Sequence, residues 1–115
     1  MSPRSRSAVA RKVTAPAPVF AALGDEMRLV LVTKLSGGQR RSISQLAAGA
    51  KVTRQAITKH LRVLEEAGVV RSARQGRENL FAFEPRRIAE ARRYLDDVAA
   101  QWDDALARLK SFVEG

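Results

Sequence analysis

The stretch TRQAITKHLRVLEEAGVVRSARQGRENLFAF, residues 53–83, joins two different periodicities and decides the fold of the chain. Its first half repeats apolar residues at helical spacing between a good N-cap, Thr53, and a glycine suited to a left-handed helix end, Gly68. Its second half places apolar residues on both sides of a tip, Gln75-Gly76-Arg77, which predicts a β-hairpin. The stretch therefore predicts a helix followed directly by a hairpin, with one glycine between them.

The predicted helix has two faces. An apolar stripe of Ile57, Leu61 and Leu64 is widened by Ala56, Val63 and Ala67, and the opposite arc holds Arg54, Gln55, Thr58, Lys59 and Arg62. Polar helix faces are usually only solvated, but this arc contains no acid. Arg and Gln can form paired hydrogen bonds with base edges in a major groove, and Lys and Thr suit phosphates. We therefore interpret the arc as a DNA-contacting surface.

The predicted hairpin is basic at its tip, because Arg71 and Arg74 precede Gln75-Gly76-Arg77. A hairpin can serve only to cover the edge of a core. With this charge at its end, contact with phosphates or a minor groove is the favoured interpretation.

Charge is concentrated where these two elements lie. The 115 residues carry a formal net charge of +9, and residues 40–77 alone hold nine Lys/Arg against two glutamates, a net +7. Such a distribution is typical of a surface that binds a polyanion. There is no cysteine, which excludes disulfides and thiolate metal sites. No Ser/His/Asp set, Cys/His set or glycine-rich phosphate loop is present, so we expect no enzyme, no catalytic residue and no cofactor.

The rest of the chain predicts one domain at residues 16–115 after a disordered basic tail at residues 1–15. A short helix is expected from Val19 to Leu23, and Asp25 is expected to cap a second one. A short extended piece follows at Ser42-Ile43, and Ser44 is expected to cap a third helix that runs to Ala48. No apolar run suits a signal peptide or a membrane span, so we expect a cytoplasmic protein without membrane contact.

The last predicted helix begins after Pro85 and carries an apolar heptad seam. Positions 88, 91, 95, 98, 102, 105, 109 and 112 read Ile, Ala, Leu, Val, Trp, Ala, Leu and Phe. Such a helix can lie along its own core, but about 28 residues span some 40 Å, more than a domain of this size covers. We therefore expect a second copy to pack on it as a homodimer through the first and last helices, with the interface made by Val19, Phe20, Leu23, Leu95, Val98, Trp102, Leu106 and Leu109.

Taken together, the segments FAALGDEMRLVLVTKL, SISQLAAGAKVTRQAITKHLRVLEEAGVV and GRENLF resemble the ArsR/SmtB family of bacterial repressors. The resemblance covers about residues 18 to 113. It implies a mostly α, winged helix-turn-helix fold with a small β-hairpin wing, and a homodimer that binds a double-stranded DNA operator and blocks transcription. Thr53 to Arg62 match the recognition helix and Arg74 to Arg77 match the wing, which adds Thr53, Arg74, Gln75 and Arg77 to the expected DNA contacts.

The chain departs from the metal-sensing members of that family. The stretch RRSISQLAAGA has no cysteine where those members have one, the last helix has no histidine, and the only histidine, His60, is expected to pack as a structural residue. We therefore expect no metal site. Three functions stay open: a dimeric DNA-binding repressor, which explains most of the pattern, a ligand- or metal-gated sensor with an unknown small-molecule inducer, and a nonspecific DNA-binding or protein-interaction module.

Overall fold

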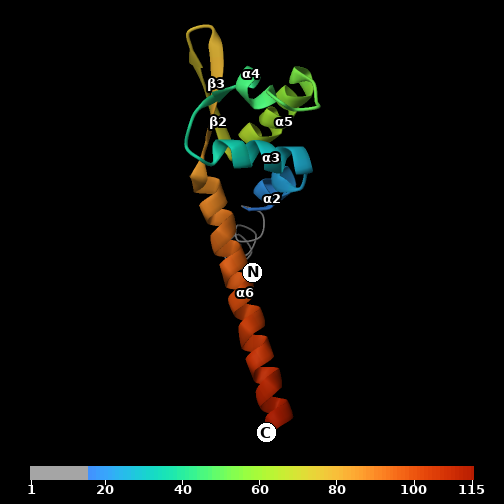
Figure 1. Ribbon diagram of the computed structural model, residues 1–115. Coiled ribbons are helices and arrows are strands. Elements are labelled where there is room, and N and C mark those ends of the chain that lie inside the picture. The colour runs from blue at the N-terminus through green and yellow to red at the C-terminus, as the bar shows by residue number, and fades with distance from the viewer. Residues whose placement is uncertain (1–15) are drawn as a thin grey trace, which may run out of the picture.

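The computed structural model of the protein describes residues 16–115, and the predicted tail at residues 1–15 lies outside the described residues. A helical head with a projecting hairpin sits at one end of a single long helix (Figure 1). The elements, in chain order, are α2 (Ala17–Leu23), α3 (Glu26–Leu35), β1 (Arg41–Ser42), α4 (Ile43–Ala47), α5 (Arg54–Glu66), β2 (Val70–Gln75), β3 (Glu78–Phe83) and α6 (Pro85–Glu114). The prediction of a mostly α fold with a hairpin is confirmed.

Helices α2 and α3 form where the sequence predicts them. The first starts two residues earlier than expected, since Pro18 is tolerated in a first helical turn. Asp25 caps α3 as predicted, its Oδ2 accepting a hydrogen bond from the backbone N–H of Arg28 at 3.0 Å. Leu31 and Leu35 on α3 are fully buried. These two helices therefore close one side of the head.

The helix-turn-helix consists of α4 and α5. The prediction that Ser44 caps α4 is wrong: the cap is Ser42, whose hydroxyl accepts from the N–H of Gln45 while the Gln45 side chain accepts from the N–H of Ser42. This reciprocal pair is a capping box, and it starts the helix two residues earlier. Thr53 caps α5 as predicted.

Helix α5 ends at Glu66 through Gly68, which has a φ of +78°. The N–H of Val69 donates to the carbonyl of Leu64 and the N–H of Gly68 to that of Glu65, which is a Schellman closure. The chain turns sharply enough for β2 to begin at Val70. The predicted direct junction of helix and hairpin is confirmed.

The sheet has three antiparallel strands in the order β1-β3-β2. Strands β2 and β3 pair from Val70↔Phe83 to Gln75↔Glu78 around a two-residue turn, in which Gly76 has a φ of +63°. On the other side of β3, Arg41 pairs with Phe81 and Ser42 with Leu80. This third strand ties the start of α4 to the wing, and it fixes the helix-turn-helix relative to the hairpin.

The core lies inside the head. Its largest fully buried side chains come from α2, α3, α4, α5, the α5–β2 connection and the start of β2: they are Val19, Leu31, Leu35, Leu46, Ile57, Leu61, Leu64, Val69 and Val70. Val63, predicted to widen the apolar stripe of α5, is instead 38% exposed because it lies at the edge of that stripe. The fully buried residues hold α5 by one face only.

Helix α6 packs on the head only near its start. Ile88 packs against the core and Ala91 is buried. The centroid of the Tyr94 ring lies 5.9 Å from the centroid of the Phe20 ring on α2. Beyond this point the helix projects away from the head (Figure 1). Among the described helices, none combines the length and apolar character needed to cross a membrane.

Candidate nucleic-acid interface

Helix α5 presents its polar arc to solvent. Its buried face anchors it through Ile57, Leu61 and Leu64, and the opposite face leaves Arg54, Gln55, Lys59 and Arg62 exposed, with Thr58 half-buried. No acidic side chain stands on this arc until Glu65 and Glu66 at the far end of the helix. The first turns of α5 are therefore an exposed and purely basic or neutral polar surface.

Three of the predicted contact residues at the start of α5 are engaged in hydrogen bonds within the protein. The Thr53 hydroxyl accepts the capping hydrogen bond from Ala56, and the Thr58 hydroxyl donates to the carbonyl of Arg54 at 2.8 Å. The Arg54 guanidinium donates to Oγ of Ser44 at 2.5 Å. Gln55 makes no side-chain hydrogen bond within residues 16–115. Of the four residues at the start of α5, Gln55 is the one with its whole hydrogen-bonding capacity available.

Sequence reasoning missed the role of Arg28 in holding α5. Its Nε donates to the carbonyl of Ala22 at 2.5 Å, and its Nη1 lies 3.3 Å from Nδ1 of His60 on α5. Oδ2 of Asp25 lies 3.8 Å from the same His60 nitrogen. The backbone N–H of Arg28 lowers the pKa of Asp25, and the charges of Arg28 and His60 lower it further against an opposing effect of burial. This cluster joins α5 to the α2–α3 junction, in keeping with the packing role expected of His60.

The residues of the wing that are predicted to contact DNA are exposed. Arg74, Gln75 and Arg77 all lie exposed at the end of the hairpin, which projects from the head (Figure 1). Arg71, nearer the base, is paired with Glu84 at 3.0 Å. The Ser72 hydroxyl donates to Glu65 at the end of α5. The base of the wing is therefore tied to the head, while the cations at its tip are presented to solvent.

The tip of the wing and the start of α5 line one hollow. Its volume is about 240 Å³, and its lining comes from β1, α4, α5 and the hairpin: Ser42, Ile43, Ser44, Arg54, Arg77, Glu78 and Asn79. Arg54 and Arg77, far apart in sequence, thus belong to one surface. The sequence offered no signal for Ser44 and Asn79, because their place in this hollow depends on the β1–β3 pairing.

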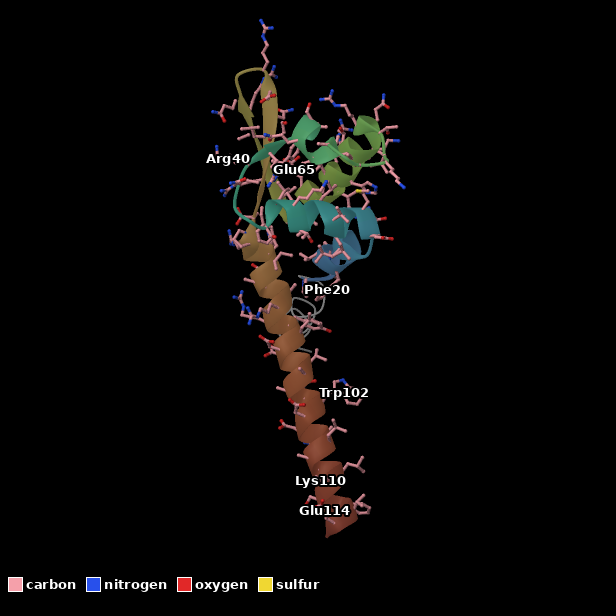
Figure 2. All side chains as sticks on the ribbon, in the orientation of Figure 1. Phe20, Arg40, Glu65, Trp102, Lys110 and Glu114 are labelled. Atoms are coloured by element: carbon pink, nitrogen blue, oxygen red, sulfur yellow. The ribbon has the colours of Figure 1, made fainter. Side chains whose placement is uncertain are left out.

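The expected interface residues differ in how far they are exposed in the single chain. Leu95, Trp102, Leu106 and Leu109 are each more than half exposed, and Val98, Phe20 and Leu23 are half-buried. Val19 is only 1% exposed, so its prediction as an interface residue is wrong: it belongs to the core of its own protomer. Figure 2 shows Trp102 on the projecting part of α6, beyond the level of Phe20.

No group of three or more His, Cys, Asp or Glu side chains converges as a metal site within residues 16–115. Asp96, Asp97, Asp103 and Asp104 lie exposed along α6, and His60 is engaged by Arg28.

Comparison with known proteins agrees with this geometry. A family model described as a helix-turn-helix domain matches residues 23–73. The uncharacterized HTH-type transcriptional regulator YuzN of Bacillus subtilis is 38% identical over 71 residues, which cover 56% of this chain and 77% of that protein. The HTH-type transcriptional repressor SmtB of Mycobacterium tuberculosis is 33% identical over 85 residues, 74% of this chain and 61% of SmtB.

Solved structures show the same fold. An ArsR-like transcriptional regulator from Rhodococcus sp. RHA1 aligns with a TM-score of 0.75 and 39% identity, over 86% of this chain and 92% of that one. The homodimeric winged helix-turn-helix DNA-binding domain of Mb0332 from Mycobacterium bovis aligns with a TM-score of 0.62 and 25% identity, over 94% and 93% of the two chains. The chain belongs to the ArsR/SmtB family of winged helix-turn-helix transcriptional regulators, which are DNA-binding proteins and not enzymes.

Proposed function

We propose that the protein is a homodimeric, sequence-specific transcriptional repressor that binds an inverted-repeat operator. The observation that carries this proposal is the exposed, acid-free face at the start of α5, set beside the basic tip of the wing. In a helix-turn-helix the start of the second helix reaches base edges in the major groove. Repression, rather than activation, is supported by the relative SmtB, which is a transcriptional repressor.

In the proposed complex some contact residues recognise base edges and others bind the phosphate backbone. Gln55 and Arg54 read base edges, since both side chains can form paired hydrogen bonds. Lys59, Arg62, Arg74 and Arg77 neutralise phosphates, and Thr53, Thr58 and Gln75 add shorter polar contacts. The phosphate contacts supply affinity that falls with salt, and the base contacts supply discrimination.

Three considerations support the homodimer. One recognition helix makes too few base contacts to select a site in a genome, and two copies related by a two-fold axis double that number. The head leaves several large apolar side chains of α6 uncovered, so a second copy has a surface to cover. The Mb0332 domain, which is homodimeric, supports the same assembly. Two recognition helices then enter major grooves one helical turn, about 34 Å, or a multiple of it apart.

The proposal is tested by a mobility shift with the purified protein and the DNA upstream of its own gene. A scrambled fragment of the same length and base composition is the control, at a salt concentration near that of a cell. We expect a discrete complex with the upstream fragment at protein concentrations that leave the scrambled fragment free. Equal binding to both fragments would identify a nonspecific DNA-binding module instead.

A further inference from the structure

Ser44 on α4 holds the guanidinium of Arg54, although it lies outside the set of expected DNA contacts. Its Oγ accepts a hydrogen bond from Nη2 of Arg54 at 2.5 Å, across the turn that joins α4 to α5. Both residues are exposed, and both line the hollow between α4, α5 and the wing. A side-chain contact therefore joins the first residue of α5 to the preceding helix, at the edge of the exposed basic arc.

We propose that Ser44 is a positioning residue, whose hydroxyl orients Arg54 so that Arg54 recognises a guanine in each operator half-site. This inference rests on the proposed function, in which Arg54 recognises a base edge. It adds the identity of that base and the residue that orients the guanidinium. Ser44 acts through Arg54 and not by binding DNA itself.

The hydrogen bond to Ser44 leaves Arg54 able to recognise a guanine. A guanidinium carries five N–H groups in a planar fork, and Nη2 contributes one N–H to each of two neighbouring donor pairs. Ser44 engages one of these groups, so one complete pair of parallel N–H groups stays free. Such a pair matches O6 and N7 of guanine, which is the commonest specific contact of arginine in a major groove.

Both ends of the contact belong to ordered elements. The capping box between Ser42 and Gln45 starts α4, and the pairing of Ser42 with β3 ties that start to the sheet. On the other side, the hydroxyl of Thr58 donates to the carbonyl of Arg54 within α5. The hydroxyl of Ser44 is thus a fixed anchor, and the guanidinium is ordered before DNA binds. The cost in side-chain entropy of forming the base contact is then smaller.

A neutral partner preserves the charge of Arg54. The Glu78 carboxylate lines the same hollow, and an ion pair with it would occupy N–H groups of Arg54 and offset its charge. No such pair forms in the described part of the chain. The hydroxyl of Ser44 accepts without carrying a charge, so Arg54 stays oriented and remains a cation toward a polyanion.

The test uses the consensus duplex that the native protein selects from random DNA. The base pair recognised by Arg54 is the one at which Arg54→Ala loses its preference, and we expect a guanine there. Preference is the dissociation constant for a duplex with A·T at this pair, divided by that for the consensus duplex. This ratio should be about 5 to 100 for the native protein. Ser44→Ala should lower it by about two- to tenfold and leave the preference due to Gln55 unchanged.

A double-mutant cycle separates positioning from direct contact. If Ser44 acts through Arg54, Ser44→Ala has no effect on either duplex in an Arg54→Ala background. Ser44→Thr keeps the hydroxyl and should restore most of the preference. Ser36→Ala is the matched control, because it removes another exposed hydroxyl, which donates to the carbonyl of Thr33. It should leave the preference as it is.

A measurement on the DNA-free protein tests the anchor directly. NMR relaxation of the Nε–H group of Arg54 reports its order on the picosecond-to-nanosecond timescale. We expect an ordered group in the native protein and a markedly more mobile one in Ser44→Ala. The melting temperature should be the same for both, because the cap of α4 is Ser42 and not Ser44.

Equal order of Arg54 in the native and Ser44→Ala proteins would overturn the proposal. A loss of affinity in Ser44→Ala that is the same for both duplexes and persists without Arg54 would do so as well, since Ser44 would then bind a phosphate itself. A preference at this pair for a base other than guanine would also overturn it. A native protein that selects no consensus would instead remove the proposed function, so the two failures are told apart.

Discussion

Gln55 lies exposed in the first turn of α5, while Thr53, Arg54 and Thr58 around it each place a side-chain group in a hydrogen bond within the protein. We therefore expect Gln55 to carry more base discrimination than its neighbours. Gln55→Ala should relax the preference at one operator position in each half-site and cost about 1–3 kcal/mol of binding free energy there. The measurement is affinity for a set of operators in which each base pair is varied in turn.

Lys59→Ala is the matched control, because Lys59 is exposed on the same arc but suits a phosphate. It should weaken all operator variants by a similar factor. A Gln55→Ala protein whose base preferences equal those of the native protein would place the reading surface elsewhere.

Asp25 gives a prediction about pH. Its folded pKa is lowered, chiefly because its carboxylate accepts from the backbone N–H of Arg28. A group with a lowered folded pKa stabilises the fold above its ordinary value, here 3.8, and loses that contribution as the pH falls through the folded value. Asp25→Ala should therefore lower the free energy of unfolding at neutral pH, and its difference from the native protein should shrink below pH 3.8.

Asp25→Asn separates the cap from the charge, since asparagine is an equally good N-cap that does not titrate. In urea unfolding across this pH range it should remain more stable than Asp25→Ala, with a difference between the two variants that does not depend on pH. A native-to-alanine difference that stays constant down to strongly acidic pH would show that the charge of Asp25 contributes nothing.

At the scale of elements, the wing should supply affinity rather than specificity. Arg74 and Arg77 are exposed at its tip, suited to phosphates or a narrow minor groove. Replacing both with alanine should weaken binding to operator and unrelated DNA by comparable factors and reduce the slope of log affinity against log salt by about 2, one for each lost phosphate contact. Arg71→Ala is the control, because Arg71 already pairs with Glu84. A loss confined to the operator would make the wing a base reader.

The elements that depend on local rules could be predicted from the sequence. Asp25 and Thr53 cap their helices, and Gly68 ends α5 in a left-handed conformation, because each needs only neighbouring backbone groups. The Ser42–Gln45 capping box is equally local, but the adjacent Ser44 offers a competing cap two residues later, and the sequence prediction chose that one. The hairpin followed from alternation around Gly76.

The parts that depend on tertiary contacts could not be predicted. The pairing of β1 with β3 joins residues about forty positions apart, and two residues of extended chain carry no signal of their partner. The same holds for the contact of Arg28 with His60 and for the hollow shared by Arg54 and Arg77. Val19 and Trp102 are both apolar residues of predicted helices, yet Val19 is buried in the head and Trp102 is exposed. The difference arises from tertiary packing: Val19 lies in the core of the head, and Trp102 lies on the part of α6 that projects beyond it.

At the scale of the whole molecule, Trp102 links stability to dimerisation. It is 65% exposed in the single chain, so its replacement should do little to the head itself. In the proposed dimer Trp102→Ala should cost about 3–5 kcal/mol. This loss should appear as weaker dimerisation, melting that depends more strongly on protein concentration, and weaker operator binding. Asp103→Ala, the outward neighbour, is the control. A Trp102→Ala protein that stays dimeric at nanomolar concentration and binds its operator normally would exclude this part of α6 from the interface.

The central claim is that two copies of α5, held by one dimer, read a symmetric DNA site. Selection of binding sites from random duplex DNA by the native protein tests it most directly, since it assumes no operator. We expect an inverted repeat, bound by one dimer per site, with half-sites separated by whole helical turns, and the Gln55→Ala protein should select a repeat degenerate at one matching base pair in each half. Selection of a single asymmetric site, or of no common sequence at all, would contradict the claim.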